Sequence, residues 1–123
     1  MQRRSASGLA ALLLAAALGL PPVPAAQAHA IVVAAAPGPG EQVKGPDVPV
    51  ALRFNSRIDR ERSRLSLLRS SGKPEIVPLA ASAPDTLAGK LQDLSPGSYR
   101  LRWQVLGVDG HITRGDIPFA VIP

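Results

Sequence analysis

The segment Gly97–Leu106, with the sequence GSYRLRWQVL, constrains the fold more than any other part of the chain. Large apolar side chains alternate with polar ones along it. A period of two is typical of a β-strand with one buried and one solvent-exposed face, and it does not fit an amphipathic helix. The segment therefore predicts a core strand with an inward and an outward set of side chains. The inward set is Tyr99, Leu101, Trp103 and Val105, and the outward set is Arg100, Arg102 and Gln104.

Further strand candidates, separated by turn signals rich in Pro, Gly, Ser and Asp, follow one another after residue 28. Val48–Phe54 (VPVALRF) shows the same alternation, and no apolar stripe of helical period is sustained anywhere in this region. We therefore predict an all-β fold, a single antiparallel Greek-key barrel or sandwich of about seven strands. The weaker strand candidates are Ala30–Ala36, Ser63–Ser70, Glu75–Ala80, Thr86–Leu91 and Asp116–Ile122.

The beginning of the chain has the layout of a cleavable secretory signal peptide. Two arginines precede an apolar run at Leu9–Leu20, which is 12 residues long. Roughly 20 apolar residues are needed to span a bilayer, so a retained anchor is disfavoured. The tripeptide AQA at 26–28 then matches the small-x-small rule of signal peptidase. We predict a signal peptide at residues 1–28 and one domain at residues 29–123, exported to the periplasm without membrane insertion.

The composition of the predicted mature chain excludes several classes of function. It has no Cys, and the one Met of the sequence is Met1, so thiolate chemistry, disulfides and sulfur ligands are all excluded. It keeps 12 of the 14 basic residues against nine acidic ones, a net charge of +3. Five basic residues lie between Arg53 and Arg64, but they are interleaved with acids and lack aromatic neighbours that could stack on bases. We therefore predict a solvated strand and turn there, and no nucleic-acid site.

The two histidines of the sequence stand where a metal site could form. Cleavage after residue 28 makes His29 the first residue, with an α-amine and an imidazole on one residue. His111 lies two residues after Asp109 in the sequence DGH, a spacing that places both side chains on the same face of an extended segment. Asp-Gly is also a common hairpin turn, so Asp109 alone has a purely structural explanation. If the first and the penultimate strands lie side by side, all four groups converge on one ion.

The donor types of this set indicate which metal it prefers. Nitrogen donors with one carboxylate and no sulfur favour Cu(II), whereas Cu(I) prefers thiolate or thioether ligands. Zn(II) is chemically possible as well. Cu(II) ranks highest in the divalent affinity series, and an α-amine with a pKa of about 7.7–8.0 is readily deprotonated by such an ion. The sequence therefore predicts one Cu(II) per chain, with His29, Asp109 and His111 as metal ligands.

The mature region resembles the CopC-type periplasmic copper-resistance proteins along essentially its whole length, residues 29–123. The resemblance rests on HAIVVAAAPGPGEQV, PVALRFNSRID and GSYRLRWQVLGVDGHITRGDIPFAV. It implies a cupredoxin-like or immunoglobulin-like barrel, with Cu(II) held by the N-terminal His and by the Asp and His of DGH. Those roles fall on His29, Asp109 and His111. It further implies an inner-membrane copper transporter of the CopD type as a partner.

The chain departs from the family pattern at three places. Ala36 stands where the family usually has Ser before a Pro-containing turn. Some members have an acidic residue after the L-x-F strand, where this chain has Asn55-Ser56-Arg57. Whether this strand supplies a fourth protein ligand is therefore left open by the sequence. Members that also bind Cu(I) carry a Met-rich segment, which the mature chain lacks. We expect a version of the family that binds Cu(II) and not Cu(I).

Two other classes of function remain as alternatives. A terminal His with a second His is also the histidine brace of lytic polysaccharide monooxygenases. Such enzymes need open coordination positions and a substrate face, yet the chain has only four aromatic residues, and Asp109 would occupy a position that oxygen needs. The other alternative is a metal-free, immunoglobulin-like interaction module. We predict a copper-binding protein without enzyme activity and without catalytic residues.

Overall fold

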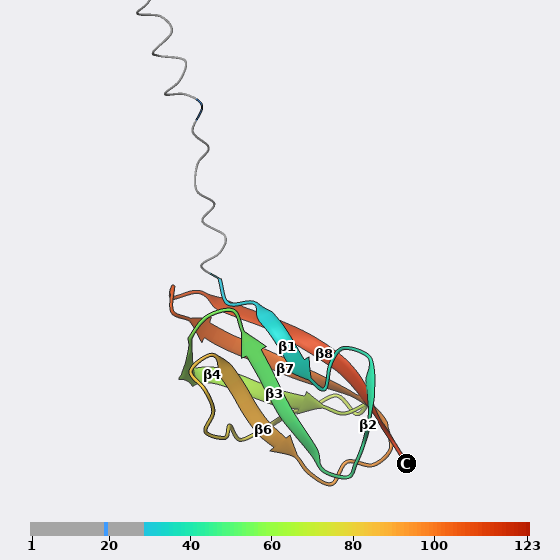
Figure 1. The fold of residues 1–123 in the computed structure, drawn as a ribbon. Coiled ribbons are helices and arrows are strands. Elements are labelled where there is room, and N and C mark those ends of the chain that lie inside the picture. The colour runs from blue at the N-terminus through green and yellow to red at the C-terminus, as the bar shows by residue number, and fades with distance from the viewer. Residues whose placement is uncertain (1–18, 20–28) are drawn as a thin grey trace, which may run out of the picture.

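The computed structural model describes residue 19 and residues 29–123, in which eight strands form two packed sheets (Figure 1). The smaller sheet has the order β1-β3-β6 and the larger sheet the order β2-β8-β7-β4-β5. The strands are β1 (Val32–Ala36), β2 (Glu41–Lys44), β3 (Val48–Phe54), β4 (Ile58–Leu68), β5 (Pro74–Ile76), β6 (Thr86–Leu91), β7 (Gly97–Gly107) and β8 (Ile112–Ile122). Apart from residue 19, the predicted signal peptide lies outside the described residues. Within the described residues, no helix has the length and apolar character needed to cross a membrane.

The predicted all-β sandwich is confirmed, with two differences in detail. The sequence predicted about seven strands, and the structure has eight because Glu41–Lys44 forms β2. This segment, EQVK, has one large apolar residue and no alternation, so its strand conformation comes from pairing with a neighbour. That neighbour is β8, and the pair is parallel, whereas every other strand pair of the described sheets is antiparallel. The fold is therefore mostly, not wholly, antiparallel.

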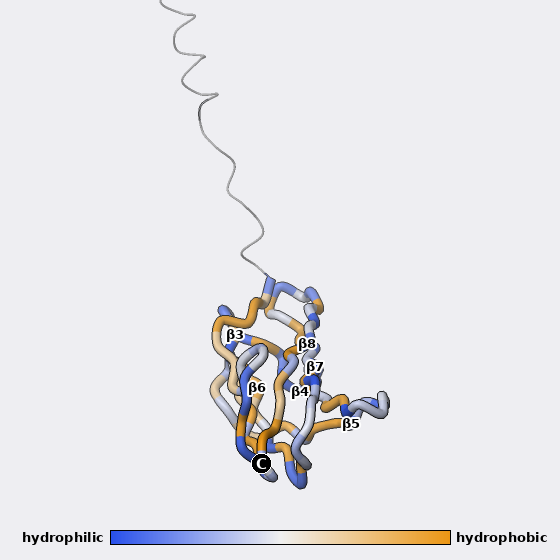
Figure 2. The backbone as a smooth tube through the Cα atoms, turned by 90° about the vertical axis from the view of Figure 1, so that its right-hand side faces the viewer, coloured by the Kyte–Doolittle hydropathy of each residue, from blue (hydrophilic) through white to orange (hydrophobic). Residues whose placement is uncertain are grey.

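The alternation in β7 produces the predicted burial. Leu101 and Val105 are completely buried, and Tyr99 and Trp103 are partly buried against the core. The indole of Trp103 meets Phe54 of β3 edge-on, with ring centroids 5.4 Å apart, so this contact joins the two sheets. Large apolar residues of β3, β4, β6, β7 and β8 fill the space between the sheets. The side view in Figure 2 shows the β4–β5 hairpin projecting from one side of this body.

The arrangement of β1, β7 and β8 decides where the candidate site lies. β7 and β8 pair without interruption from Gly97↔Val121 to Leu106↔Ile112 and end in a tight hairpin. β1 pairs with β3 in the other sheet and not with β7, so the first and penultimate strands are not neighbours in one sheet. The segment before β1 instead reaches the end of the sandwich where the β7–β8 hairpin turns, as Figure 1 shows.

Candidate metal centre

Gly107 and His111 close the β7–β8 hairpin, and Asp109 is the middle one of the three residues between them. Gly107 donates its N–H to the carbonyl of His111 over 2.9 Å, and Gly110 donates to the carbonyl of Gly107 over 3.0 Å. Gly110 has φ = 83°, a left-handed conformation that glycine adopts without strain and that ends such loops. A Cβ on Gly107 would lie 2.9 Å from Oδ1 of Asp109, so a glycine here leaves room for the carboxylate.

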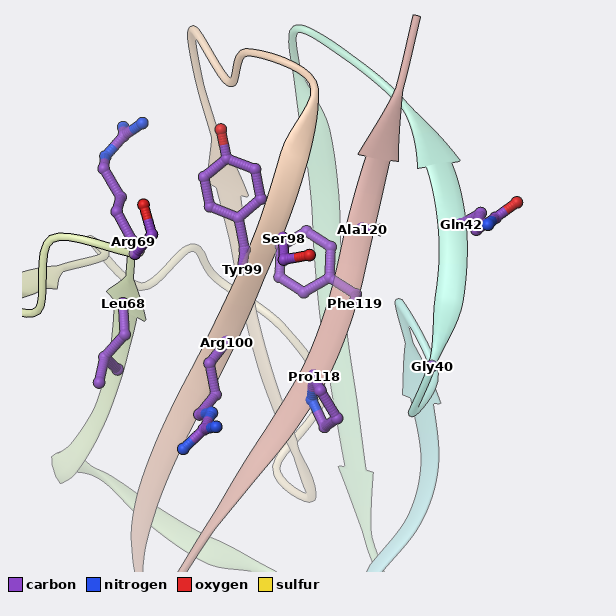
Figure 3. A pocket seen from close by; sticks show the side chains of 11 residues that line it. Gly40, Gln42, Leu68, Arg69, Ser98, Tyr99, Arg100, Pro118, Phe119 and Ala120 are labelled. Carbon is purple, nitrogen blue, oxygen red and sulfur yellow. The ribbon is translucent and has the colours of Figure 1, made fainter.

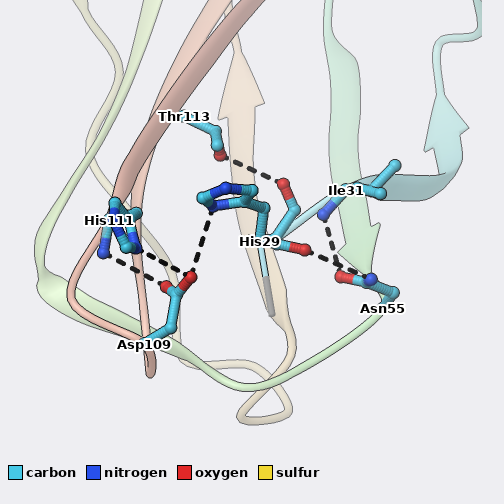
Figure 4. Close-up of polar contacts among 7 residues, drawn as sticks. His29, Ile31, Asn55, Asp109, His111 and Thr113 are labelled. Carbon is cyan, nitrogen blue, oxygen red and sulfur yellow. Dashed lines mark hydrogen bonds and ion pairs between the residues drawn. The ribbon is translucent and has the colours of Figure 1, made fainter. Parts of the chain in front are cut away.

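The two carboxylate oxygens of Asp109 have different roles. One holds the turn, and the other is a candidate metal ligand. Oδ1 accepts the backbone N–H of His111 over 3.1 Å and holds the turn. Oδ2 lies 3.0 Å from Nδ1 of His111 and 3.3 Å from Nδ1 of His29 (Figure 4). The hydrogen bond from the His111 backbone is the main cause that lowers the pKa of Asp109 below its ordinary value, and both imidazoles add to it. The carboxylate is therefore charged at neutral pH.

The two imidazoles lie next to each other at the exposed end of the sandwich. Their ring centroids are 4.7 Å apart and the ring planes are nearly perpendicular. The side chains of His29 and His111 are 47% and 65% exposed, whereas that of Asp109 is 13% exposed. Solvent thus reaches both histidines, while the carboxylate between them is largely covered.

Two of the three separations among these side chains suit ligands of one metal ion. Bonds of about 2.0–2.1 Å place neighbouring ligand atoms about 2.8–3.4 Å apart in square or tetrahedral geometry. The two separations between imidazole nitrogen and carboxylate oxygen, 3.0 and 3.3 Å, lie in that range. One ligand atom from each residue lies within 4.8 Å of the other two. The structure therefore brings together all three residues that the sequence singled out.

Asn55 holds the segment that carries His29. Its Oδ1 accepts the N–H of Ile31 over 2.8 Å, and its Nδ2 donates to the carbonyl of His29 over 3.3 Å (Figure 4). The backbone N–H of Asn55 donates to the carbonyl of Ile31 as well. The side-chain amide of Asn55 therefore hydrogen-bonds to the backbone on both sides of residue 30. Sequence reasoning noted Asn55 only as part of a stretch that lacks the acidic residue of some family members. It missed this contact because the partners lie 24 and 26 residues away.

Thr113 of β8 fixes the same segment from the opposite sheet. Its hydroxyl donates to the carbonyl of Ala30 over 3.1 Å, and Ala30 is a buried residue of the core. The backbone after His29 is therefore tied to the ends of β3 and β8 together. The sequence offered no signal for Thr113, whose partner is 83 residues distant.

Comparisons with known proteins place the chain in a family. The model of the CopC domain matches residues 32–122, a range that includes Asp109 and His111 and begins after His29. The crystal structure of CopC from Methylosinus trichosporium OB3b is 32% identical with a TM-score of 0.69, over 77% of this chain and 95% of that chain. PcoC from Escherichia coli, a methionine-rich copper resistance protein, is 22% identical with a TM-score of 0.63, over 77% and 100%. At that identity PcoC supports the fold alone.

A third relative is much longer than this chain. The copper transport protein CutJ of Bacillus subtilis (strain 168) is 26% identical over 98 residues, which is 76% of this chain and 18% of CutJ. The chain thus spans less than a fifth of that relative. The family match covers most of the described residues, and the M. trichosporium protein shares the fold and nearly a third of the aligned residues. This chain is a member of the CopC family.

Proposed function

We propose that this protein binds one Cu(II) ion in the periplasm after residues 1–28 have been removed. The ligands in this proposal are the α-amine and imidazole of His29, the imidazole of His111 and the carboxylate of Asp109. The observation that carries it is the grouping of two imidazoles around one Asp109 oxygen, at 3.0 and 3.3 Å, at an exposed end of the fold. The family match to the CopC domain and the copper transport role of CutJ support copper as the metal.

The donor set favours Cu(II) over Cu(I). Two imidazoles, an amine and a carboxylate are suited to the tetragonal geometry of Cu(II). PcoC is described as methionine-rich, whereas the single Met of this chain is Met1, in the proposed signal peptide. Cu(I), which prefers sulfur ligands, therefore has no suitable donors in the mature chain.

We infer a copper carrier without enzyme activity. The Asp109 oxygen that faces both imidazoles would fill a coordination position that an oxygenase keeps open for oxygen. The exposure of both histidines suits transfer of the ion to a partner. A membrane copper transporter of the CopD type is the partner we propose, on the family resemblance.

The decisive experiment compares the exported protein with a variant that has one Gly inserted before His29. N-terminal sequencing first establishes that the exported protein begins at His29. The inserted Gly turns the amine of His29 into an amide, a much poorer donor, while the imidazole and the fold are kept. We expect Cu(II) affinity to fall by more than about 100-fold, equivalent to about 2.7 kcal/mol, and the nitrogen coupling in the electron paramagnetic resonance spectrum to change.

The matched control adds the same Gly after Pro123, at the other end of the chain, and should bind Cu(II) like the exported protein. Ag(I), a sulfur-seeking analogue of Cu(I), should bind poorly to all forms. Equal Cu(II) affinity with and without the Gly before His29 would refute the amine as a ligand. An exported protein that binds no Cu(II) would favour the metal-free interaction module.

A further inference from the structure

The outer face of the larger sheet is rich in arginine. The register aligns outward-facing residues of β4, β7 and β8 in three rows. Their inward-facing neighbours, such as Leu65, Leu101 and Ile117, are buried in the core, which fixes the rows on the solvent side. The rows are Arg64–Gln104–Arg114, Ser66–Arg102–Asp116 and Leu68–Arg100–Pro118. Four guanidinium groups and one carboxylate thus share this surface, which we name the arginine face.

Internal ion pairs neutralise only part of the arginine face. Arg102 donates to both oxygens of Asp116, over 2.8 and 3.0 Å, and Arg100 lies 3.6 Å from the same carboxylate. Within the part of the chain that the structure describes, neither Arg64 nor Arg114 pairs with a carboxylate. These two arginines flank Gln104 at a Cα separation of about 10 Å, two strand spacings. Like charges so close on one sheet face repel each other, and a bound anion would remove that repulsion.

The arginine face is hollowed, and donor groups line the hollow. A groove of about 660 Å³ is lined by Arg64, Ser66, Gln104 and Arg114, among others. Guanidinium groups bind carboxylates through paired hydrogen bonds, and the hydroxyl of Ser66 and the amide of Gln104 can donate beside them. Trp103, the only Trp of the sequence, borders this groove on β7, while its indole packs inward against Phe54.

A second groove lies at the next row of residues along the same strands. It has a volume of about 550 Å³ and is lined by Leu68, Arg100, Ser98 and Pro118, among others (Figure 3). Gln104 in the first groove and Ser98 in the second are six residues apart on β7, a distance of about 20 Å in an extended strand. The two grooves together have the length of an extended peptide of about six residues.

The shape and composition of this surface favour a polypeptide over a lipid bilayer as the occupant. A bilayer surface is flat on this scale and would leave both grooves unfilled. Proteins that bind at a bilayer surface insert aromatic or large aliphatic side chains. The large exposed hydrophobic residues of the described chain contain no aromatic residue, and none of them lines either groove. They are Ile31, Val33, Ile76, Val108 and Ile112.

We propose that the arginine face is the docking surface for an extended, carboxylate-rich segment of a partner protein, with Arg64 and Arg114 as its main anion-binding residues. The surface lies on the side of the sandwich, and its arginines are separate from the three residues of the candidate metal centre. This docking requires no metal. It therefore goes beyond copper binding, and its test is independent of the outcome for copper.

The test titrates the purified, metal-free protein with an N-acetylated, C-amidated hexaglutamate peptide. Binding, followed by isothermal titration calorimetry, should saturate and should weaken as salt rises from about 0.05 to 0.3 M, because the contacts are charged and exposed. The double variant Arg64→Gln/Arg114→Gln should weaken binding by about tenfold, the value for two exposed ion pairs. The matched control Arg53→Gln/Arg57→Gln, which removes the same charge elsewhere, should retain the affinity of the wild type. Hexaglutamine should not bind.

A further variant is expected to strengthen the binding of hexaglutamate. Asp116→Asn removes the one carboxylate of the arginine face and releases Arg100 and Arg102, so hexaglutamate should bind several-fold more tightly. The proposal is overturned if hexaglutamate does not bind, or if both double variants weaken binding equally. It is also overturned if phosphatidylglycerol vesicles bind in an Arg64- and Arg114-dependent manner while the peptide does not.

Discussion

At the scale of single residues, the candidate site depends on side chains that position the ligands as much as on the ligands themselves. Asn55 is the main one, because it contacts backbone groups of both His29 and Ile31. Its role explains why a strand end in the smaller sheet determines where His29 lies. Asp109 plays a comparable part in the larger sheet, since one of its oxygens holds the hairpin that carries His111.

Substitution of Asn55 by Ala tests this positioning role. It removes the acceptor for the Ile31 N–H and the donor to the His29 carbonyl, so the proposed N-terminal ligand becomes more mobile. We expect Cu(II) affinity to fall by about 10-fold or more, as for other residues that orient metal ligands, with little loss of folded protein. Isothermal titration and electron paramagnetic resonance measure the effect. Ser56→Ala is the control, because the Ser56 hydroxyl makes no hydrogen bond within the described residues. Wild-type affinity in Asn55→Ala would contradict the positioning role.

At the scale of strands, the sequence predicted those elements whose side chains differ sharply between the two faces. β3 and β7 were recognised from alternation because one face of each packs in the core and the other is solvated. β2 was not, because EQVK has no such alternation and depends on β8. The row Arg64–Gln104–Arg114 could not be predicted either. It requires the register between β4 and β7, which shifts between Asp59 and Arg64 and leaves no local sequence signal.

The cross-strand pair of Asp116 with Arg102 gives the β7–β8 hairpin a defined dependence on pH. The hydrogen bonds from Arg102 lower the pKa of Asp116, so this carboxylate stabilises the fold only while it is charged. Asp116→Asn should therefore lower the free energy of unfolding by up to about 1 kcal/mol near pH 6, since the pair is partly exposed. As the pH falls below the unfolded value of about 3.9 and through the lower folded pKa, the difference should vanish.

Urea unfolding of both proteins near pH 6 and near pH 2.5 measures this difference. The control is Asp47→Asn, whose carboxylate lies 3.9 Å from Lys90 on the surface of the smaller sheet, and which should have a smaller effect. A difference between wild type and Asp116→Asn that stays constant with pH would mean that the pair does not stabilise the hairpin through its charge.

At the scale of the whole molecule, the candidate metal centre lies where the two sheets meet. His29 is held through Asn55 at the end of β3, in the smaller sheet. Asp109 and His111 belong to the hairpin of the larger sheet, and Thr113 links that sheet to Ala30. The sequence singled out these three residues as candidate ligands and considered their meeting only for adjacent first and penultimate strands. They meet because the segment before β1 crosses the open end of the sandwich. Only long-range contacts determine the path of that segment.

A metal ion bound to His29 and His111 would therefore connect the sheets and stabilise the whole fold. Because the ligands are assembled only in the folded chain, Cu(II) at about 100 times its dissociation constant should add about 2.7 kcal/mol of stability. For a domain of this size that corresponds to a rise in melting temperature of about 10 °C or more. Thermal unfolding followed by circular dichroism measures it, and hydrogen exchange should slow in the β7–β8 hairpin and in β1 together. His111→Ala removes one of the two proposed ligands on the larger sheet, so at the same Cu(II) concentration its melting temperature should rise much less. An equal rise in His111→Ala would mean that copper stabilises the fold without His111 as a ligand.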